Sequence, residues 1–161
     1  MRKTAIALIG LALLTFPGIT LAWSGKVIAV HDGDTISVMH SGRVEKVRLF
    51  GIDCPERGQD FGTRAKEFAA DFAFGKIAEV SPVDRDQYGR TVAWVSVEGK
   101  SLNKELVKAG LAWWYRRHAE DAIELMDLEC EARKNKVGLW SRPNPVPPWK
   151  FRRNKRHEGY D

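Results

Sequence analysis

The chain has 161 residues, the length of one ordinary domain with short appendages. Apolar residues make up 43% and charged residues 29% of the sequence, a balance that excludes a wholly disordered chain. Two cysteines are too few for a disulfide-dense scaffold or a four-cysteine zinc site. The formal net charge is +5, and its position along the chain is more informative than its sum.

The first 22 residues have the pattern of a cleavable secretory signal. Arg2 and Lys3 precede a continuous apolar stretch, and Thr-Leu-Ala at 20–22 places small residues at the two positions that determine cleavage. An uncleaved membrane anchor is the alternative, because the uncharged stretch could almost span a bilayer. We expect a mature chain that begins at Trp23, is exported to the periplasm or the medium, and has no stable membrane association.

The chain divides into the signal (1–22), a body (23–141) and a C-terminal tail (142–161). The body is nearly neutral, with 18 basic and 19 acidic residues, whereas the tail has a net charge of +4. Four prolines favour an extended, solvated tail, while its charge suits an arm that attracts phosphates. Both interpretations stay open, and the tail contains none of the residues assigned to catalysis below.

Strand patterns dominate the first half of the body. A turn at Asp32-Gly33-Asp34 separates the first two strands, and glycine is expected there because a positive φ costs it little. In the third strand Val47 and Leu49 share one face, and Lys46 and Arg48 the other. The predicted strands cover 26–31, 35–39, 44–52, 76–83 and 91–97.

Three helices complete the prediction. Apolar residues recur at spacings of three and four in each, and the last helix is expected to bury Ile123, Met126, Cys130 and Val137. The predicted helices cover 61–74, 102–109 and 122–136. Strands in meander order followed by helices predict an α+β fold, a five-stranded OB-type barrel with three packed α-helices, rather than a doubly wound parallel sheet.

Candidate metal ligands lie in a turn before the second predicted strand and at the end of the third. Asp34 closes the first hairpin turn, and Asp53 and Glu56 follow the third strand. If the second and third strands pair, Asp34 and Asp53 converge on an all-oxygen site suited to Ca²⁺. The sequence has no histidine cluster or thiolate pair for zinc or copper. Taken alone, the same aspartates equally fit ordinary turn caps.

Candidate phosphate-binding residues are Arg48 on the third strand and Arg90 at the start of the fifth. A guanidinium matches a phosphate because it donates two parallel charge-assisted hydrogen bonds and stays charged. Each arginine taken singly is also typical of a solvated strand.

Six motifs in consistent order and spacing resemble those of the thermonuclease, or staphylococcal nuclease-like, family. Each is weak alone, but together they span nearly the whole body. They are Asp32-Gly33-Asp34-Thr35, Val47-Arg48-Leu49, Asp53-Cys54-Pro55-Glu56, Asp86-Gln87-Tyr88-Gly89-Arg90, Leu106-Val107-Lys108-Ala109-Gly110-Leu111-Ala112 and Gly138-Leu139-Trp140.

The resemblance implies a Ca²⁺-dependent nuclease that hydrolyses DNA and RNA and leaves 3′-phosphates. We expect the protein to be a monomer. Asp34, Asp53 and the backbone carbonyl of Cys54 would hold the ion. It implies further that Glu56 is the general base and that the catalytic arginines, Arg48 and Arg90, hold the phosphate. No group in this set reads a base edge, so little sequence specificity is expected.

The chain departs from the family pattern at several positions. Cys54 replaces the usual threonine, which leaves a carbonyl ligand intact, and Gln87 replaces a lysine, which removes one phosphate contact. Tyr88, Tyr115 and Arg116 are the candidates for substrate binding.

Export would expose Cys54 and Cys130 to an oxidising compartment, so a disulfide between them is one expectation and two free thiols the other. A non-catalytic OB module that only binds nucleic acid is the competing function, and a structural adaptor is a third. Because such non-catalytic copies lose ligand and base positions that are all present here, the sequence favours the enzyme.

Overall fold

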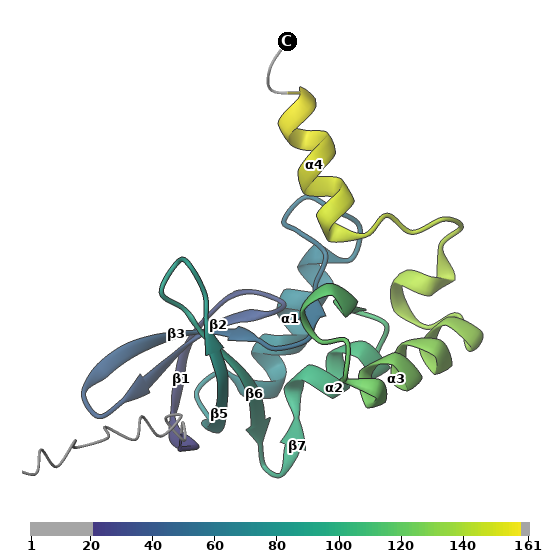
Figure 1. Cartoon of the computed structure of the whole chain (residues 1–161). Helices are drawn as coiled ribbons and strands as arrows, with labels where there is room; N and C mark the ends of the chain where they lie inside the picture. The colour runs from purple at the N-terminus through teal and green to yellow at the C-terminus, as the bar shows by residue number, and fades with distance from the viewer. Residues whose placement is uncertain (1–20, 159–161) are drawn as a thin grey trace, which may run out of the picture.

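The strands of the computed structural model begin at Trp23, close to the expected start of the mature chain (Figure 1). The structure describes residues 21–158, so nearly all of the predicted signal lies outside the described residues. The strands are β1 (Trp23–Asp32), β2 (Thr35–His40), β3 (Arg43–Leu49), β4 (Ile52–Asp53), β5 (Ile77–Arg85), β6 (Thr91–Val97), β7 (Lys100–Ser101) and β8 (Trp113–Trp114).

Five of these strands form a closed barrel. β1 pairs with both β2 and β5, β2 pairs with β3, and β5 pairs with β6, all antiparallel. A parallel pairing of β3 with β6, in which Val47 lies opposite Thr91, closes the barrel. Val47 and Leu49 point into the core as their alternation predicts, while Arg48 stays partly exposed. The OB-type barrel predicted from the sequence is confirmed.

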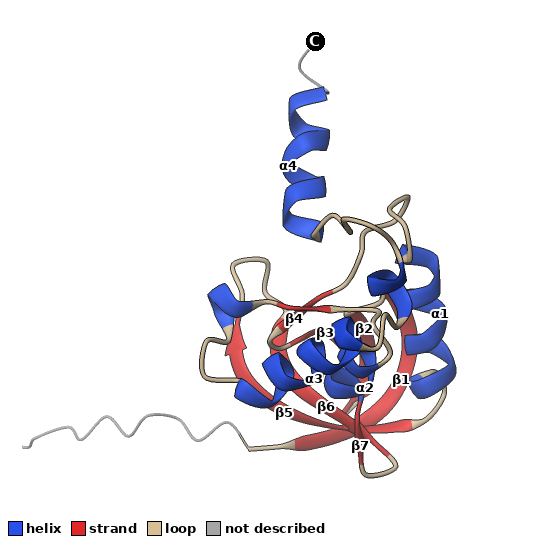
Figure 2. Ribbon diagram, turned by 90° about the vertical axis from the view of Figure 1, so that its right-hand side faces the viewer, coloured by secondary structure: helices blue, strands red, loops and turns tan. Residues whose placement is uncertain are grey.

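The described residues form four α-helices, one more than the sequence predicted: three pack around the barrel and the fourth, α4, extends away from it. α1 packs along β1 and buries Ala65 and Ala69, and α2 packs against both α3 and β6 (Figure 2). The helices are α1 (Gly62–Ala73), α2 (Leu102–Lys108), α3 (Ile123–Lys134) and α4 (Pro148–Glu158), with short 3₁₀ turns η1 (Arg116–His118) and η2 (Gly138–Ser141). None of the helices within 21–158 is long and apolar enough to cross a membrane.

The predicted inner stripe of α3 is wrong. Ile123 is 53% exposed and Cys130 is also on the solvent side, whereas Leu125, Glu129 and Ala132 are buried. The apolar pattern was a poor guide because this helix buries a carboxylate, that of Glu129. Burial raises the pKa of Glu129 above its ordinary value. The charge of Glu129 is compensated by an ion pair with Arg133 at 3.3 Å, one turn along the helix.

The glycine of the β1–β2 turn is required for space rather than for a positive φ. Gly33 is not among the residues with left-handed backbone, contrary to the prediction. A β-carbon at this position would lie 2.7 Å from the Ala65 β-carbon and 2.8 Å from the Cys54 sulfur. The turn that carries Asp34 can therefore pack directly on α1 and on the strand end that carries Cys54.

The basic tail is not extended throughout. After a proline-rich connection at 142–147 the chain forms α4, which stands away from the barrel (Figures 1 and 2). Pro148 begins the helix, where its missing N–H would be unpaired in any residue. The interpretation of the prolines as a sign of an extended end is wrong from residue 148 onward, because these prolines precede or begin a helix.

Candidate active site

A cleft of about 940 Å³ opens at the end of the barrel where β3 and β4 meet the β1–β2 turn and the β5–β6 loop. The five residues that the sequence assigned to the metal, the base and the phosphate all line this cleft. They are Asp34, Arg48, Asp53, Glu56 and Arg90. Residues separated by up to 56 positions in the sequence thus share one surface.

Strand pairing places the two aspartates side by side. In the β2–β3 hairpin Thr35 lies opposite Arg48, and the Leu49 N–H donates to the Asp34 carbonyl at 2.8 Å. Asp53 follows in β4, where it is held opposite Trp113 of β8. The expectation that Asp34 and Asp53 converge through pairing of the second and third strands is confirmed.

Arg48 links the two buried carboxylates. Its Nη1 lies 2.8 Å from Asp34 Oδ1, and its Nη2 lies 2.8 Å from Asp53 Oδ1. Asp34 and Asp53 are only 6% and 1% exposed. The Cys54 N–H donates to Asp34 Oδ2 at 2.6 Å, which fixes the second oxygen of that carboxylate. Arg48 is therefore held in one orientation from both sides.

The electrostatics of this cluster favour additional positive charge. Burial raises the pKa of Asp34 to about 7; Arg48 opposes the shift, and the neighbouring carboxylates Asp32 and Asp53 add to it. Burial alone would lower the pKa of Arg48, but Asp34 and Asp53 raise it overall. A cation placed near these aspartates would relieve both the burial penalty and their mutual repulsion.

The donor set fits a hard, oxygen-preferring ion. Within residues 21–158 no three His, Cys, Asp or Glu side chains form a metal-binding group, so Asp34 and Asp53 would have to be completed by main-chain oxygens and water. Such a set suits Ca²⁺ and does not suit zinc or copper, which prefer nitrogen and sulfur ligands. The carbonyl of Cys54 as a further ligand stays a prediction.

No disulfide joins Cys54 to Cys130, so that expectation is wrong for this structure. Cys54 is buried against the β1–β2 turn, and Cys130 is on the exposed side of α3. Burial also raises the pKa of the Cys54 thiol well above its ordinary value, so it stays neutral and packs as a small apolar side chain. Both cysteines are free.

Arg90 also lines the cleft, at the base of the β5–β6 loop. Its Nε lies 2.6 Å from Asp86 Oδ2, and Asp86 Oδ1 accepts the N–H groups of Tyr88 and Arg90. Burial alone would raise the pKa of Asp86, but these hydrogen bonds together lower it, so the carboxylate stays ionised. The Arg90 guanidinium is 5.5 Å from the centre of the Tyr88 ring, so the loop presents an arginine and an exposed aromatic together.

The two other candidates for substrate binding separate in the structure. Tyr115 lines the cleft with the carboxylates, whereas Arg116 lines a neighbouring groove that Tyr115 also borders. The Tyr115 ring stacks on Trp149 of α4, with 5.4 Å between ring centres and 21° between planes. Tyr115 therefore connects the cleft to α4, and Arg116 does not belong to the cleft itself.

Arg152 of α4 is a cleft residue that sequence reasoning missed. Its guanidinium contacts both oxygens of Asp53, with Nη2 at 2.8 Å from Oδ2 and Nη1 at 3.2 Å from Oδ1, and also contacts Glu56 Oε1. The basic composition of the tail was the available signal, but composition does not indicate which arginine returns to the barrel.

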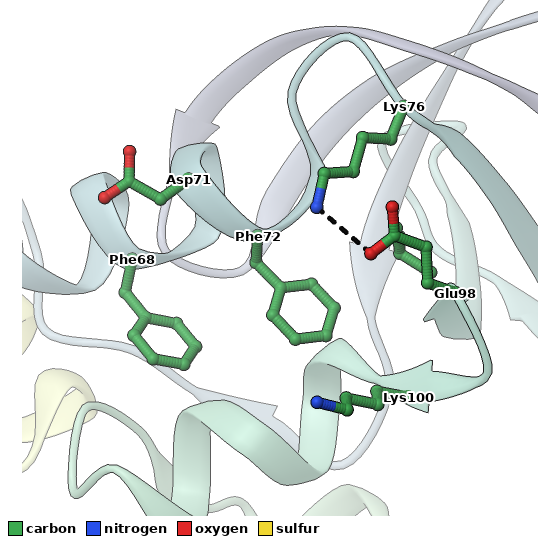
Figure 3. A pocket seen from close by; sticks show the side chains of 7 residues that line it. Phe68, Asp71, Phe72, Lys76, Glu98 and Lys100 are labelled. Atoms are coloured by element: carbon green, nitrogen blue, oxygen red, sulfur yellow. Dashed lines mark hydrogen bonds and ion pairs between the residues drawn. The ribbon is translucent and has the colours of Figure 1, made fainter.

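A smaller pocket of about 340 Å³ contains none of the predicted site residues (Figure 3). Phe68 and Phe72 of α1 form its apolar side, and Lys76 and Glu98 form an ion pair at 3.3 Å on its rim. Its mixture of one exposed ion pair and two rings lacks the converging buried charges of the large cleft. The chemistry of this molecule is therefore assigned to the large cleft.

An OB-type barrel with buried carboxylates and arginines in one cleft defines a class of enzymes that act on phosphate esters. Residues 46–142 match the model of the family described as "Staphylococcal nuclease homologue". The chain belongs to this family and is an endonuclease, which confirms the resemblance and makes a purely structural adaptor untenable.

Several bacterial proteins are similar over most of their length. An uncharacterized endonuclease of Escherichia coli O157:H7 is 39% identical over 146 residues, which covers 90% of this chain and 95% of the relative. A micrococcal nuclease of Shigella flexneri is 38% identical, covering 82% and 83% respectively. Protein ParB of Escherichia coli is 42% identical, covering 86% and 87%.

Proposed function

We propose that this endonuclease hydrolyses the phosphodiester bonds of both DNA and RNA, depends on Ca²⁺ and leaves 3′-phosphate ends. The observation that carries the proposal is the pair of buried aspartates, Asp34 and Asp53, held by Arg48 in the cleft that also contains Glu56 and Arg90. This set supplies two carboxylates for a cation, one carboxylate for proton transfer and two guanidinium groups for phosphate.

Glu56 is the group best placed to act as general base. Its side chain is 38% exposed in the cleft, whereas the two aspartates are buried and committed to Arg48. A water molecule attacking phosphorus must lose a proton, and a carboxylate within hydrogen-bond reach accepts it as the bond to phosphorus forms. The electron pair of the breaking bond then goes to the departing 5′ oxygen.

Arg48 and Arg90 would stabilise the charge that grows on the phosphate. Arg48 lies on β3 and Arg90 directly precedes β6, and both line the cleft, so a phosphate between them could receive charge-assisted hydrogen bonds from both side chains. Neither arginine is placed by the fold to read a base edge. Acceptance of both DNA and RNA with little sequence preference follows, because backbone contacts carry no base information.

Asp34 and Asp53 would hold Ca²⁺, with the Cys54 carbonyl as the further ligand. Bound there, the ion would supply positive charge that stabilises the transition state and orients the phosphate, while leaving proton removal to a side chain. The raised pKa of Asp34 supports this assignment, because its cause is burial near other carboxylates without enough compensating charge.

The test is a digestion assay on single- and double-stranded DNA and RNA. Purified protein is incubated with Ca²⁺, with Mg²⁺ or with excess chelator, and the ends of labelled products are tested for removal of a 3′-phosphate by a phosphatase. We expect hydrolysis of all four substrates in Ca²⁺ and poor activity in Mg²⁺, since the all-oxygen loop site suits the larger ion. Equal turnover in chelator would exclude the metal assignment, and 3′-hydroxyl ends would exclude the proposed bond cleavage.

We also propose that the chain is exported, loses residues 1–22 and acts as a monomer without stable membrane association. The signal-like pattern of the first residues supports this, as does the start of β1 at Trp23, directly after the expected cleavage position. Mass measurement of protein recovered from cell fractions tests it. A full-length chain retained in the cytoplasm would contradict it.

A further inference from the structure

Arg152 gives the active site a third arginine from the far end of the chain. It lies in α4, 99 residues after Asp53 and 96 after Glu56, and its guanidinium contacts both carboxylates. The contact with Asp53 is bidentate: the two terminal nitrogens of the planar guanidinium each donate to one carboxylate oxygen. A lysine could not reproduce this bridge, because its ammonium is a single donor centre.

The position of Arg152 is fixed by packing at the start of α4. Pro148 is buried, Trp149 stacks on Tyr115, and its ring centre lies 5.7 Å from that of Trp113 in β8. Ahead of the helix, Gln59 Nε2 donates to the Val146 carbonyl at 2.6 Å. These contacts tie the start of α4 to the region of β8 and to Gln59, three residues after Glu56, so Arg152 reaches the cleft from an anchored element.

Glu56 depends on this contact more than Asp53 does. Asp53 is also held by Arg48, whereas Arg152 is the one cation that pairs with the Glu56 carboxylate within the described part of the chain. The backbone of Glu56 is fixed by Gln59, which accepts its N–H at 3.0 Å, but that bond leaves the side chain free to rotate. The orientation of the carboxylate is therefore set by Arg152.

We propose that Arg152 is a positioning residue of the nuclease, which orients the Glu56 carboxylate for proton removal while bridging it to Asp53. This inference rests on the proposed function, in which Glu56 is the general base. Arg152 acts through Glu56 rather than on the substrate, so its loss should lower kcat and leave KM nearly unchanged. A displacement of about 1 Å at a reacting group can cost about 10²-fold in rate, which sets the scale of the effect.

The experiment compares Arg152→Gln with Arg153→Gln. The two variants lose the same charge from adjacent positions of α4, but Arg153 is exposed and forms no ion pair among residues 21–158. With DNA and Ca²⁺, we expect Arg152→Gln to lower kcat by about 10- to 10²-fold at nearly constant KM. Arg153→Gln should keep the wild-type kcat. Arg152→Lys should fall between Arg152→Gln and the wild type, because one ammonium restores part of the contact.

A double variant separates positioning from a general structural effect. In the Glu56→Gln background, Arg152→Gln should change kcat by less than about twofold, because the group that Arg152 positions is already absent. Thermal unfolding of each variant establishes that it is folded in the assay. If Arg152→Gln is not folded, Arg152→Lys alone decides: a lowered kcat at constant KM supports the proposal, and a wild-type kcat overturns it.

Three results would overturn the proposal. The first is that Arg152→Gln has the same kcat as Arg153→Gln. The second is that the loss of kcat in Arg152→Gln adds in full to the loss in Glu56→Gln. The third is that Arg152→Gln raises kcat, which would mean that Arg152 blocks the cleft. An inactive wild-type protein would count against the proposed function, whereas an active wild type with an unaffected Arg152→Gln would count against this inference alone.

Discussion

Arg48 allows two buried carboxylates to lie next to each other at the end of a barrel. Asp34 and Asp53 are buried and would repel each other, and one guanidinium between them reduces that repulsion. Burial nevertheless raises the pKa of Asp34 to about 7, and the neighbouring carboxylates Asp32 and Asp53 add to the shift. A residue that contributes to the fold in this way is also positioned to contribute to catalysis.

Glu56→Gln should lower kcat by at least about 10²-fold, the lower end of the contribution of a general base. The amide keeps the shape of the side chain but cannot accept the proton, so KM should change much less. Steady-state kinetics on DNA in Ca²⁺ measure both constants. Glu67→Gln on the exposed side of α1 is the control, and a near-normal kcat for Glu56→Gln would place the base elsewhere.

Asn103→Ala should lower the free energy of unfolding by about 3 kcal/mol, because buried groups left without partners cost about 1–3 kcal/mol each. Asn103 is fully buried in α2; its Oδ1 accepts the Val95 N–H at 3.0 Å, and its Nδ2 donates to the Phe50 carbonyl at 2.9 Å. Urea unfolding measures the change. Exposed Asn154 is the comparison, and Asn154→Ala should change the free energy of unfolding by less than about 0.5 kcal/mol. Equal changes at both positions would refute the role of these hydrogen bonds.

At the scale of elements, α4 changes the interpretation of the basic tail. Arg152 alone turns inward to the cleft, and the remaining basic side chains with a described environment are exposed along the same helix. A deletion of the tail would therefore remove a cleft residue together with the surface charge. The two interpretations of the tail have to be separated by substitutions that leave Arg152 in place.

Neutralising the exposed basic side chains of α4 should weaken DNA binding at low salt without changing kcat. For every phosphate that α4 can no longer bind, the slope of log K against log salt should become shallower by about 0.7–0.9. The salt dependence of KM measures this. The replaced residues are Lys150, Lys155 and Arg156.

A matched variant distinguishes this effect from net charge. It replaces three exposed lysines carried by α1, α2 and α3, and it should keep the wild-type slope. The control positions are Lys66, Lys108 and Lys134. Identical slopes for both variants would show that substrate capture belongs to the barrel alone.

The sequence predicted those helices and strands in which buried apolar side chains recur at one regular spacing. The alternation around Val47 and Leu49 located β3, and its pairing with β2 brought Asp34 and Asp53 together as expected. The inner side of α3 could not be read in this way, because a buried Glu129 breaks the apolar pattern. Arg152 was beyond reach for another reason, since only tertiary packing brings a residue from α4 to Glu56.

For the whole molecule, Ca²⁺ should stabilise the fold as well as activate the enzyme. A ligand present at 100 times its Kd adds about 2.7 kcal/mol to the free energy of unfolding, which corresponds to roughly 5–15 °C in Tm for a chain of this size. Thermal unfolding with and without Ca²⁺ measures the shift, and chelator should reverse it.

Asp53→Asn should lose most of this stabilisation by Ca²⁺, while Asp71→Asn, at an exposed position of α1, should keep it. The readout is independent of catalysis, so it tests the metal site even in an inactive variant. An equal shift in both variants would place the ion outside the cleft.

The parallel contact between β3 and β6 has a consequence for how the protein folds. It joins Val47 to Thr91, so a loop of more than forty residues must be closed before the two strands can pair. Hairpins such as β2–β3 and β5–β6 join near neighbours and require much smaller loops. Because Arg48 belongs to one strand of the parallel pair and Arg90 directly precedes the other, the two arginines that we propose to bind phosphate face a common cleft only after this closure. Recovery of nuclease activity during refolding should therefore follow the slow assembly of the complete barrel, and a chain with only its hairpins formed should cut no nucleic acid.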